Sequence, residues 1–404
     1  MNEIVCDVLI IGGGLVGGPL ACALAGAGVS VAVVDQEDPA TATAPAFDGR
    51  ASAVALGPQR VLDAIGLWPG IAPHAAPIQQ IRVSDGHSPL FLHYDHQALG
   101  DDPFGWIVEN RAIRRAVLAR LPELPQARLF APATLVELDR GTDRVTATLS
   151  DRTKIFAALV VAADGRASPI RSGAGIGITR WEYDQTAIVC TVAHERPHRD
   201  IAQEHFLPAG PFAILPLPGN RSSVVWSEKS HLAPAILAQD DAAFLVELKS
   251  RFGDFLGEIS VEGPRFGYPL SLQFADAYTA RRLALVGDAA HGMHPVAGQG
   301  MNMGLRDVAA LAEVLVEAHR LGIDLGNAAV LESYARWRRF DNLLMLGLTD
   351  VMVRLFSNAN KPLALARDLG MAAVNRLPGL KRFFMRHAMG LVGELPKLMR
   401  GERL

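Results

Sequence analysis

The sequence is poor in cysteine. Only three cysteines occur in 404 residues, Cys6, Cys22 and Cys190, and none of them has CxxC spacing. Disulfide frameworks and structural zinc sites are built from cysteines in such recurring patterns, so we expect no disulfide framework and no metal site. The scarcity is typical of a protein from a reducing compartment.

Excess positive charge is also missing. The formal net charge is −3, so no overall basic field exists to attract nucleic acid, and we expect no nucleic-acid partner. No Lys or Arg precedes Arg50, which leaves out the positive start of a secretory signal peptide.

One long stretch lacks charge altogether. Residues 8–34 contain no charged side chain, and 27 residues are enough to cross a bilayer. The stretch nevertheless holds seven glycines and divides into strand, turn, helix and strand patterns. We therefore interpret it as a buried βαβ unit rather than as a membrane span.

A glycine motif opens this unit. Gly12, Gly14 and Gly17 follow a short apolar strand in GxGxxG spacing and lead into a helix of small residues. Such glycines permit a tight turn, close approach of a pyrophosphate and close helix packing, and the helix N-terminus favours phosphate. Asp35 ends the next predicted strand, where a carboxylate would bind ribose hydroxyls. The motif predicts a dinucleotide without separating FAD from NAD, although Asp35 disfavours a 2′-phosphate.

Two later motifs favour a flavin. Ala-Asp-Gly-Arg-Ala-Ser occupies residues 163–168, after a predicted strand. A second strand at 282–286 leads to Gly-Asp-Ala-Ala-His at 287–291 and then to a glycine loop at 298–302 that enters a helix. A carboxylate at Asp288 can bind ribityl hydroxyls, and a helix N-terminus can stabilise the negative charge of a reduced flavin. The structural alternative for Asp288 is a helix N-cap.

In this order and spacing the motifs resemble those of the flavoprotein aromatic hydroxylases related to p-hydroxybenzoate hydroxylase. The resemblance implies FAD as the cofactor and O₂ as a substrate. It places Asp288 on the ribityl chain and the backbone of Gly300 and Met301 at the pyrimidine edge of the flavin. It further implies that Asp164 and Gly165 lie near the pyrophosphate, that Arg50 and Asn110 contact the cofactor, and that Pro295 lies near the reactive ring carbon.

Further stretches resemble the UbiH/UbiF/VisC branch, the hydroxylases of ubiquinone biosynthesis. They include Asp-Gly-Arg-Ala-Ser-Ala at 48–53, Trp-Ile-Val-Glu-Asn at 106–110 and Glu-His-Phe at 204–206, and the resemblance covers nearly all of residues 5–340. It implies hydroxylation of the ring of a polyprenyl phenol through a flavin C4a-hydroperoxide. The protein must then exclude water, because the hydroperoxide otherwise decays to H₂O₂.

The order of patterns predicts an α/β (α+β) fold. We expect a discontinuous, Rossmann-like FAD-binding domain from residues 1–75, 100–180 and 275–335. A β-rich substrate domain from residues 76–99 and 181–274 interrupts it, and residues 336–404 form a helical C-terminal region.

The reacting groups are less well defined by sequence. Phe206, Phe212, Ile214 and Leu217 are candidate walls of a substrate pocket, with ordinary sheet core as the alternative for each. No residue has the pattern of a catalytic base. His291 is a flavin-adjacent candidate, and a structural histidine fits the sequence equally well.

The electron donor and some alternatives stay open. Only one strand–GxGxxG–helix unit occurs, so we expect either transient NAD(P)H binding or an external redox protein as donor. The Trp-x-Trp-x-Ile-Pro segment of flavin-dependent halogenases is absent. Another FAD-dependent phenol hydroxylase, a prenyl-chain reductase and a non-enzymatic FAD-binding assembly subunit remain alternatives.

The C-terminal region is basic. Residues 341–404 carry ten Lys/Arg and five Asp/Glu. An apolar stripe with helical spacing, flanked by basic residues, predicts a helix lying on anionic lipid at the cytoplasmic face of the membrane, or contacting a biosynthetic complex. A core or homodimer helix is the alternative. The stripe consists of Phe384, Ala388, Leu391, Leu395 and Leu398.

Overall fold

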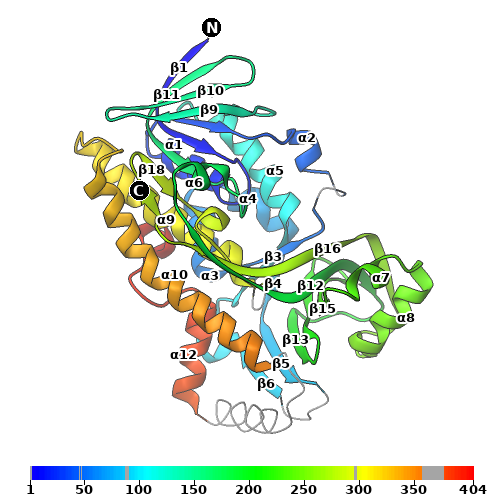
Figure 1. Cartoon of the computed structure of the whole chain (residues 1–404). Helices are drawn as coiled ribbons and strands as arrows, with labels where there is room; N and C mark the ends of the chain where they lie inside the picture. Colours follow the sequence, from blue (N-terminus) through cyan, green and yellow to red (C-terminus); the bar gives the residue numbers. More distant parts are fainter. Residues whose placement is uncertain (1, 45, 47, 87–90, 295–297, 357–376) are drawn as a thin grey trace.

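The computed structural model describes residues 2–44, 46, 48–86, 91–294, 298–356 and 377–404. Two large sheets and a small one form its framework, with helices packed around them (Figure 1). The mixed α/β fold predicted from the sequence is confirmed.

The first sheet is built around the N-terminal strand. β1 pairs in parallel with β2 and with β11, and β18 pairs in parallel with β11. The apolar run at residues 8–11 is buried in its centre, because helices cover the sheet. The predicted βαβ unit is thus confirmed. The strands are β1 (Glu3–Ile11), β2 (Val31–Val34), β8 (Ala127–Phe130), β9 (Leu135–Arg140), β10 (Val145–Leu149), β11 (Lys154–Ala162), β17 (Thr279–Ala280) and β18 (Leu283–Leu285).

The second sheet is antiparallel except for one pair. Its order is β19-β16-β12-β15-β14-β13-β5-β6, and only β13 and β5 run parallel. Two of its strands, β12 and β16, are 17 residues long and extend from the first sheet toward α7 and α8 (Figure 1). The strands are β5 (Gln80–Asp85), β6 (Phe91–Asp95), β12 (Ile178–His194), β13 (Ile201–Leu207), β14 (Gly210–Leu217), β15 (Arg221–Lys229), β16 (Ile259–Ala275) and β19 (His291–Gly292).

A three-stranded sheet joins the two. It consists of β3 (Ala51–Ala55), β7 (Gly105–Glu109) and β4 (Ala75–Ile78). The helical periodicity of residues 52–65 predicts one helix, but the first part of this stretch forms β3 and only the remainder forms α3 (Leu56–Ala64). The helical expectation was wrong for β3 because its residues pair with β7, and this tertiary pairing overrides local periodicity.

Helices cover the first sheet and one face of the second. α9 packs against α1 and α10, while α7 and α8 cover the second sheet. No helix among the described residues combines the length and apolarity needed to cross a bilayer. The helices are α1 (Gly17–Gly26), α2 (Pro39–Ala42), α4 (Trp68–Ile71), α5 (Asn110–Arg120), α6 (Pro169–Gly173), α7 (Ala233–Leu237), α8 (Asp241–Phe252), α9 (Gln299–Arg320), α10 (Ala328–Phe356) and α12 (Pro378–Ala388), with 3₁₀ turns including η4 (Gly287–Ala289) and η6 (Lys397–Arg400).

The C-terminal stripe does not lie on one helix, so that prediction was wrong. α12 ends at Ala388, and the chain then passes through Gly390 and Gly393, both with positive φ. These backbone angles and Pro396 break the helical spacing that the sequence suggests. Leu398 is instead buried in the core of the first sheet, which agrees with the alternative of a core segment. The side chain of Phe384 lies outside what the structure describes.

Candidate functional site

The turn between β1 and α1 requires its first and third motif glycines. Gly12 has φ +97°, and a Cβ there would lie 2.4 Å from the carbonyl oxygen of Ala163. A Cβ on Gly17 would lie 1.9 Å from the carbonyl oxygen of Gly12. By contrast, a Cβ on Gly14 would have nothing within 4 Å. The free space above Gly14 is what close approach of a pyrophosphate requires.

Asp35 is held against this turn. Its Oδ2 accepts a hydrogen bond of 2.6 Å from the Gly13 amide, and its Oδ1 accepts one of 2.9 Å from the Glu37 amide. These bonds fix the carboxylate at the end of β2. Its contact with a ribose stays a prediction.

A cavity of about 620 Å³ lies between the first and second sheets, and it collects residues from all three motifs. That volume falls in the range of small-molecule and cofactor sites. Leu15 and Val16 connect it to the glycine turn, whereas Gly12, Gly14, Gly17, Asp35 and Asp164 are not part of its wall. Six of the predicted FAD-binding residues line it: Arg50, Asn110, Gly165, Asp288, Gly300 and Met301.

An arginine that the sequence analysis did not assign joins the second and third motifs. Arg166 donates to the Asp288 carboxylate at 3.1 Å from Nε, and its other nitrogens donate to Ser271 and to the carbonyl of Met293. Asp288 itself sits on η4, directly after β18, and keeps 45% of its side chain exposed. The only sequence signal for Arg166 was that it belongs to the second motif, because the partners of Arg166 are far away in the chain.

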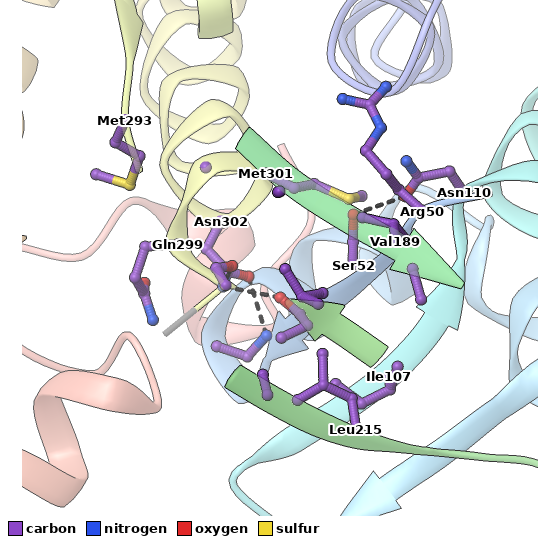
Figure 2. Close-up of a pocket in the computed structure, with 18 of the residues that line it drawn as sticks. Arg50, Ser52, Ile107, Asn110, Val189, Leu215, Met293, Gln299, Met301 and Asn302 are labelled. Atoms are coloured by element: carbon purple, nitrogen blue, oxygen red, sulfur yellow. Dashed lines mark hydrogen bonds between the residues drawn. The ribbon is translucent and has the colours of Figure 1, made fainter. Parts of the chain in front are cut away.

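Arg50 and Asn110 share one buried carboxylate, Asp48. Asp48 accepts hydrogen bonds from Arg50 Nε at 2.8 Å, from Asn110 Nδ2 at 3.0 Å and from Arg114 at 2.8 Å. Burial alone would raise the pKa of Asp48, but the bonds and charge of Arg50 dominate and hold it well below its ordinary value. Asn110 Oδ1 in turn accepts from Ser52 at 2.7 Å (Figure 2). Sequence reasoning assigned no role to Asp48.

The N-terminus of α9 forms another part of the wall. Asn302 fixes it, because its Oδ1 accepts from the Ala55 amide at 3.0 Å and its Nδ2 donates to the Ala53 carbonyl at 2.9 Å. Gly300 and Met301 belong to the first turn, where backbone N–H groups have no partner within the helix and carry the positive end of its dipole. In Figure 2 the side chain of Met301 extends toward Arg50 and Asn110, whereas Gln299 lies on the opposite side near Met293. Pro295 lies outside the described residues.

His291 is not part of the cavity wall. Its ring is buried and its Nε2 lies 2.5 Å from Oδ2 of Asp307. Asp307 also accepts from the Gly287 amide at 3.0 Å and from Arg338 Nε at 2.8 Å. Burial alone would raise the pKa of Asp307, yet the His291 and Arg338 charges lower it well below its ordinary value. Through Asp307 the His291 ring is linked to the Gly287 amide of the third motif, on the side away from the cavity, which agrees with the structural alternative for His291.

The opposite wall is the apolar face of the second sheet. On β14, Pro211, Ala213 and Leu215 line the cavity, whereas Phe212 and Ile214 point to the core under α8. Leu217 packs against the three-stranded sheet. Of the four predicted pocket walls only Phe206 lines the cavity, so the other three were wrong. Residues at alternate positions of a strand face opposite sides, and both faces here are apolar, so the sequence could not tell them apart.

The residues fit FAD. The glycine turn leaves room over Gly14, the cavity begins beside it, and a carboxylate, an arginine and a helix N-terminus meet inside it. Among the described residues, Oδ1 of Asp164 is buried without a hydrogen-bond partner, and burial raises the pKa of this carboxyl. This acceptor beside Gly165 is available for a hydrogen-bond donor of a bound cofactor. Fold and site together define an FAD-binding protein.

Comparison with known proteins agrees. The family model described as "FAD binding domain" matches residues 5–340. The chain is 61% identical over 400 residues to "Ubiquinone hydroxylase UbiL" of Rhodospirillum rubrum, covering 98% of this chain and 93% of the relative. It is 34% identical to "3-demethoxyubiquinol 3-hydroxylase" of Escherichia coli, covering 95% of this chain and 98% of that protein. The chain therefore belongs to the UbiH/UbiF/VisC-type family of FAD-dependent hydroxylases.

The solved structures show the same fold at greater distance. The crystal structure of p-nitrophenol 4-monooxygenase PnpA from Pseudomonas putida superimposes with a TM-score of 0.82 at 21% identity, covering 98% of this chain and 100% of that one. The structural match therefore covers more of the chain than the family model, which ends at residue 340.

Proposed function

We propose that this protein hydroxylates the aromatic ring of a polyprenyl phenol on the route to ubiquinone. The observation that carries the proposal is one cavity with two unlike walls. Residues of the FAD motifs, among them Asp288 and Arg50, form one wall, and the apolar face of β13 and β14 forms the other. A flat, apolar phenol fits between them, and the relatives named as ubiquinone hydroxylases support this class of substrate.

The polar wall would hold the cofactor. Asp288 would bind the ribityl hydroxyls, the amides of Gly300 and Met301 would bind the pyrimidine edge, and Arg50 and Asn110 would complete the contacts. Bound FAD, once reduced, supplies the electrons that activate O₂. Apolar side chains such as Phe206 and Leu215 then keep water from the reacting ring.

Electrons would come from NAD(P)H bound only transiently, or from an external redox protein. In the part of the chain that the structure describes, β1, the glycine turn and α1 are the single unit with dinucleotide-binding geometry. Stopped-flow mixing with NADH and NADPH separates the two sources, since rapid bleaching of the flavin by either nucleotide excludes an obligatory protein donor.

A polyprenyl tail stays in the bilayer, because moving each CH₂ group from water into an apolar environment lowers the free energy by about 0.8 kcal/mol. The enzyme would therefore meet its substrate at a membrane surface. α12 is the proposed contact: Phe383 keeps 52% of its surface exposed, and Arg382 and Arg386 beside it are exposed too. We propose that the protein acts at the cytoplasmic face of the bilayer. Arg382→Glu with Arg386→Glu should weaken sedimentation with vesicles containing phosphatidylserine, while the FAD content stays unchanged; equal sedimentation would remove α12 from the proposal.

The test of function uses the holoenzyme and 2-farnesylphenol as a probe. We expect consumption of one O₂ per reduced flavin and a product heavier by one oxygen atom, with ¹⁸O from ¹⁸O₂ in the ring. A product with saturated prenyl double bonds and no O₂ uptake would indicate a prenyl-chain reductase. FAD binding without any turnover would favour an assembly subunit. The intermediate that accumulates in a deletion strain would identify the ring position.

A further inference from the structure

An acidic side chain stands in the apolar wall of the cavity. Glu204 lies in the middle of β13, and strand alternation puts it on the same face as Ala202 and Phe206, which also line the cavity. Its cross-strand neighbours are Ala213 on β14 and Val83 on β5, and both belong to the same wall. The carboxylate therefore stands among apolar groups, where a phenol ring would lie.

This carboxylate has no partner among the described residues: it makes neither a hydrogen bond nor an ion pair there. Asp288, the other acidic residue of the cavity wall, is bound by Arg166 at 3.1 Å. Leaving a carboxylate unpaired in apolar surroundings is unfavourable, and such groups occur mainly where they act on a ligand.

Among the residues that the structure describes, neighbouring elements bring no charge to Glu204. β14 contains no titratable residue. On β5, Arg82 and Asp85 are not part of the cavity wall, and on β13 itself His205 turns away and lies 2.7 Å from Ser84 Oγ. The other titratable groups of the wall are Arg50, Arg166, Tyr268 and Asp288, and none of them is bonded to Glu204.

We propose that Glu204 is the base that removes the ring-hydroxyl proton of the substrate. This inference rests on the proposed function. The O–H bond breaks, the proton passes to a carboxylate oxygen, and the electron pair stays on the ring oxygen, which enriches the ortho and para carbons. When one oxygen atom from O₂ has been added to the ring, with two electrons from reduced FAD, the second oxygen atom leaves as water, and the attacked carbon loses its hydrogen as a proton to solvent. The carboxylic acid then returns its proton to the ring oxygen, and Glu204 is ionised again.

The chemistry of the site suits this role. Burial raises the pKa of Glu204 to about 7, whereas a phenol has a pKa of about 10. A raised pKa of the base reduces the pKa difference between base and phenol, so proton transfer from the phenol becomes less unfavourable. A base is also most effective when its pKa lies near the operating pH. Hydroxylation should therefore fall as the pH drops below about 7, because Glu204 becomes protonated.

The test compares Glu204→Gln with Glu137→Gln, an exposed acid on β9 that serves as a matched control. Prereduced holoenzyme with 2-farnesylphenol is mixed with O₂ between pH 6 and 10, and the hydroxylated product and H₂O₂ are both measured. At pH 7 we expect Glu204→Gln to lose about 100-fold in the hydroxylation rate, since a positioned base contributes 10²–10⁴-fold, with the oxygen appearing as H₂O₂. The rate should recover toward pH 10, as the phenol ionises in solution.

A binding measurement separates catalysis from structure. The dissociation constant of 2-farnesylphenol from oxidised holoenzyme should be similar for the unchanged protein, Glu137→Gln and Glu204→Gln, because glutamine has nearly the size of glutamate. Equal pH profiles of hydroxylation for all three proteins would overturn the role of Glu204 while leaving the hydroxylase intact. Absence of any hydroxylation by the unchanged protein would overturn both proposals.

Discussion

The two walls of the cavity are built on opposite principles. On the cofactor wall every carboxylate that shapes the site has fixed partners: Asp48 holds Arg50 and Asn110, Asp288 is bound by Arg166, and Asp307 supports the third motif from behind. On the substrate wall most side chains are apolar, and the one acid, Glu204, has no partner among the described residues.

The difference teaches what each wall has to do. A cofactor that stays bound through many turnovers profits from preorganised dipoles and charges, whose orientation is fixed before binding. A substrate that enters and leaves needs an apolar surface and one group whose protonation changes during the reaction. Ion-paired acids with lowered pKa values suit the first task, whereas an isolated acid with a raised pKa suits the second.

Replacing Phe212 tests the division of β14 into two faces and should give the largest effect. Phe212 is fully buried in the core between the second sheet and α8. Phe212→Ala should lower the free energy of unfolding by about 4 kcal/mol, because a large buried side chain leaves a cavity. Urea denaturation of the holoprotein measures this. A change below about 1 kcal/mol would contradict the assignment of this face to the core.

Replacing Asp288 tests the cofactor wall. Asp288→Ala removes the proposed acceptor for the ribityl hydroxyls and leaves Arg166 without its carboxylate. Hydrogen bonds to charged groups contribute roughly 1.5–3 kcal/mol each, so FAD should bind about 100-fold more weakly. The ratio of flavin to protein absorbance after gel filtration measures the loss, and circular dichroism checks the fold. Full FAD occupancy would show that Asp288 does not hold the cofactor.

Much of the cofactor wall could be predicted from the sequence. Short motifs in which glycine spacing and a carboxylate after a strand have a direct physical reason pointed to a flavin site, the family resemblance added Arg50 and Asn110, and six predicted residues meet at one cavity. Their contacts with FAD stay predictions. Asp48 and Arg166 escaped notice because their roles depend on partners, such as Arg114 and Ser271, that only the fold brings near.

The substrate wall and the tail were harder to predict. β14 is apolar on both faces, so period-two alternation gave no signal for which side meets the cavity. Glu204 belongs to the Glu-His-Phe stretch at 204–206, but only the fold shows that its cross-strand neighbours, Val83 and Ala213, are apolar. In the tail, helical spacing continued across Gly390 and Gly393, where the backbone turns. The proposed domain boundaries remain predictions.

Replacing Leu215 is the counterpart of the Phe212 experiment on the other face of β14. Leu215 lines the cavity and is only partly buried, so its loss should change stability little. Leu215→Ala should instead admit water and lower the yield of hydroxylated product per O₂ about tenfold in favour of H₂O₂, since a substrate pocket discriminates by roughly 1–3 kcal/mol per methylene group. Product and H₂O₂ are measured with 2-farnesylphenol. Unchanged coupling would mean that this face does not exclude water.

The smallest expected effect concerns the stability cost of the isolated acid. The folded-state pKa of Glu204 is about 7, above the value of about 4.3 for an unfolded glutamate, so the unfolded chain releases this proton first. The neutral carboxyl is favoured in the fold, and stability from this group is lost as the pH rises from about 4.3 through 7. Glu204→Gln should therefore match the unchanged protein at pH 4.5 and exceed it at pH 8 by about 1 kcal/mol, a value reduced because the cavity admits solvent. Urea denaturation with excess FAD at both pH values measures the difference, with Glu137→Gln as control. An equal difference at both pH values would show that Glu204 is not an isolated acid.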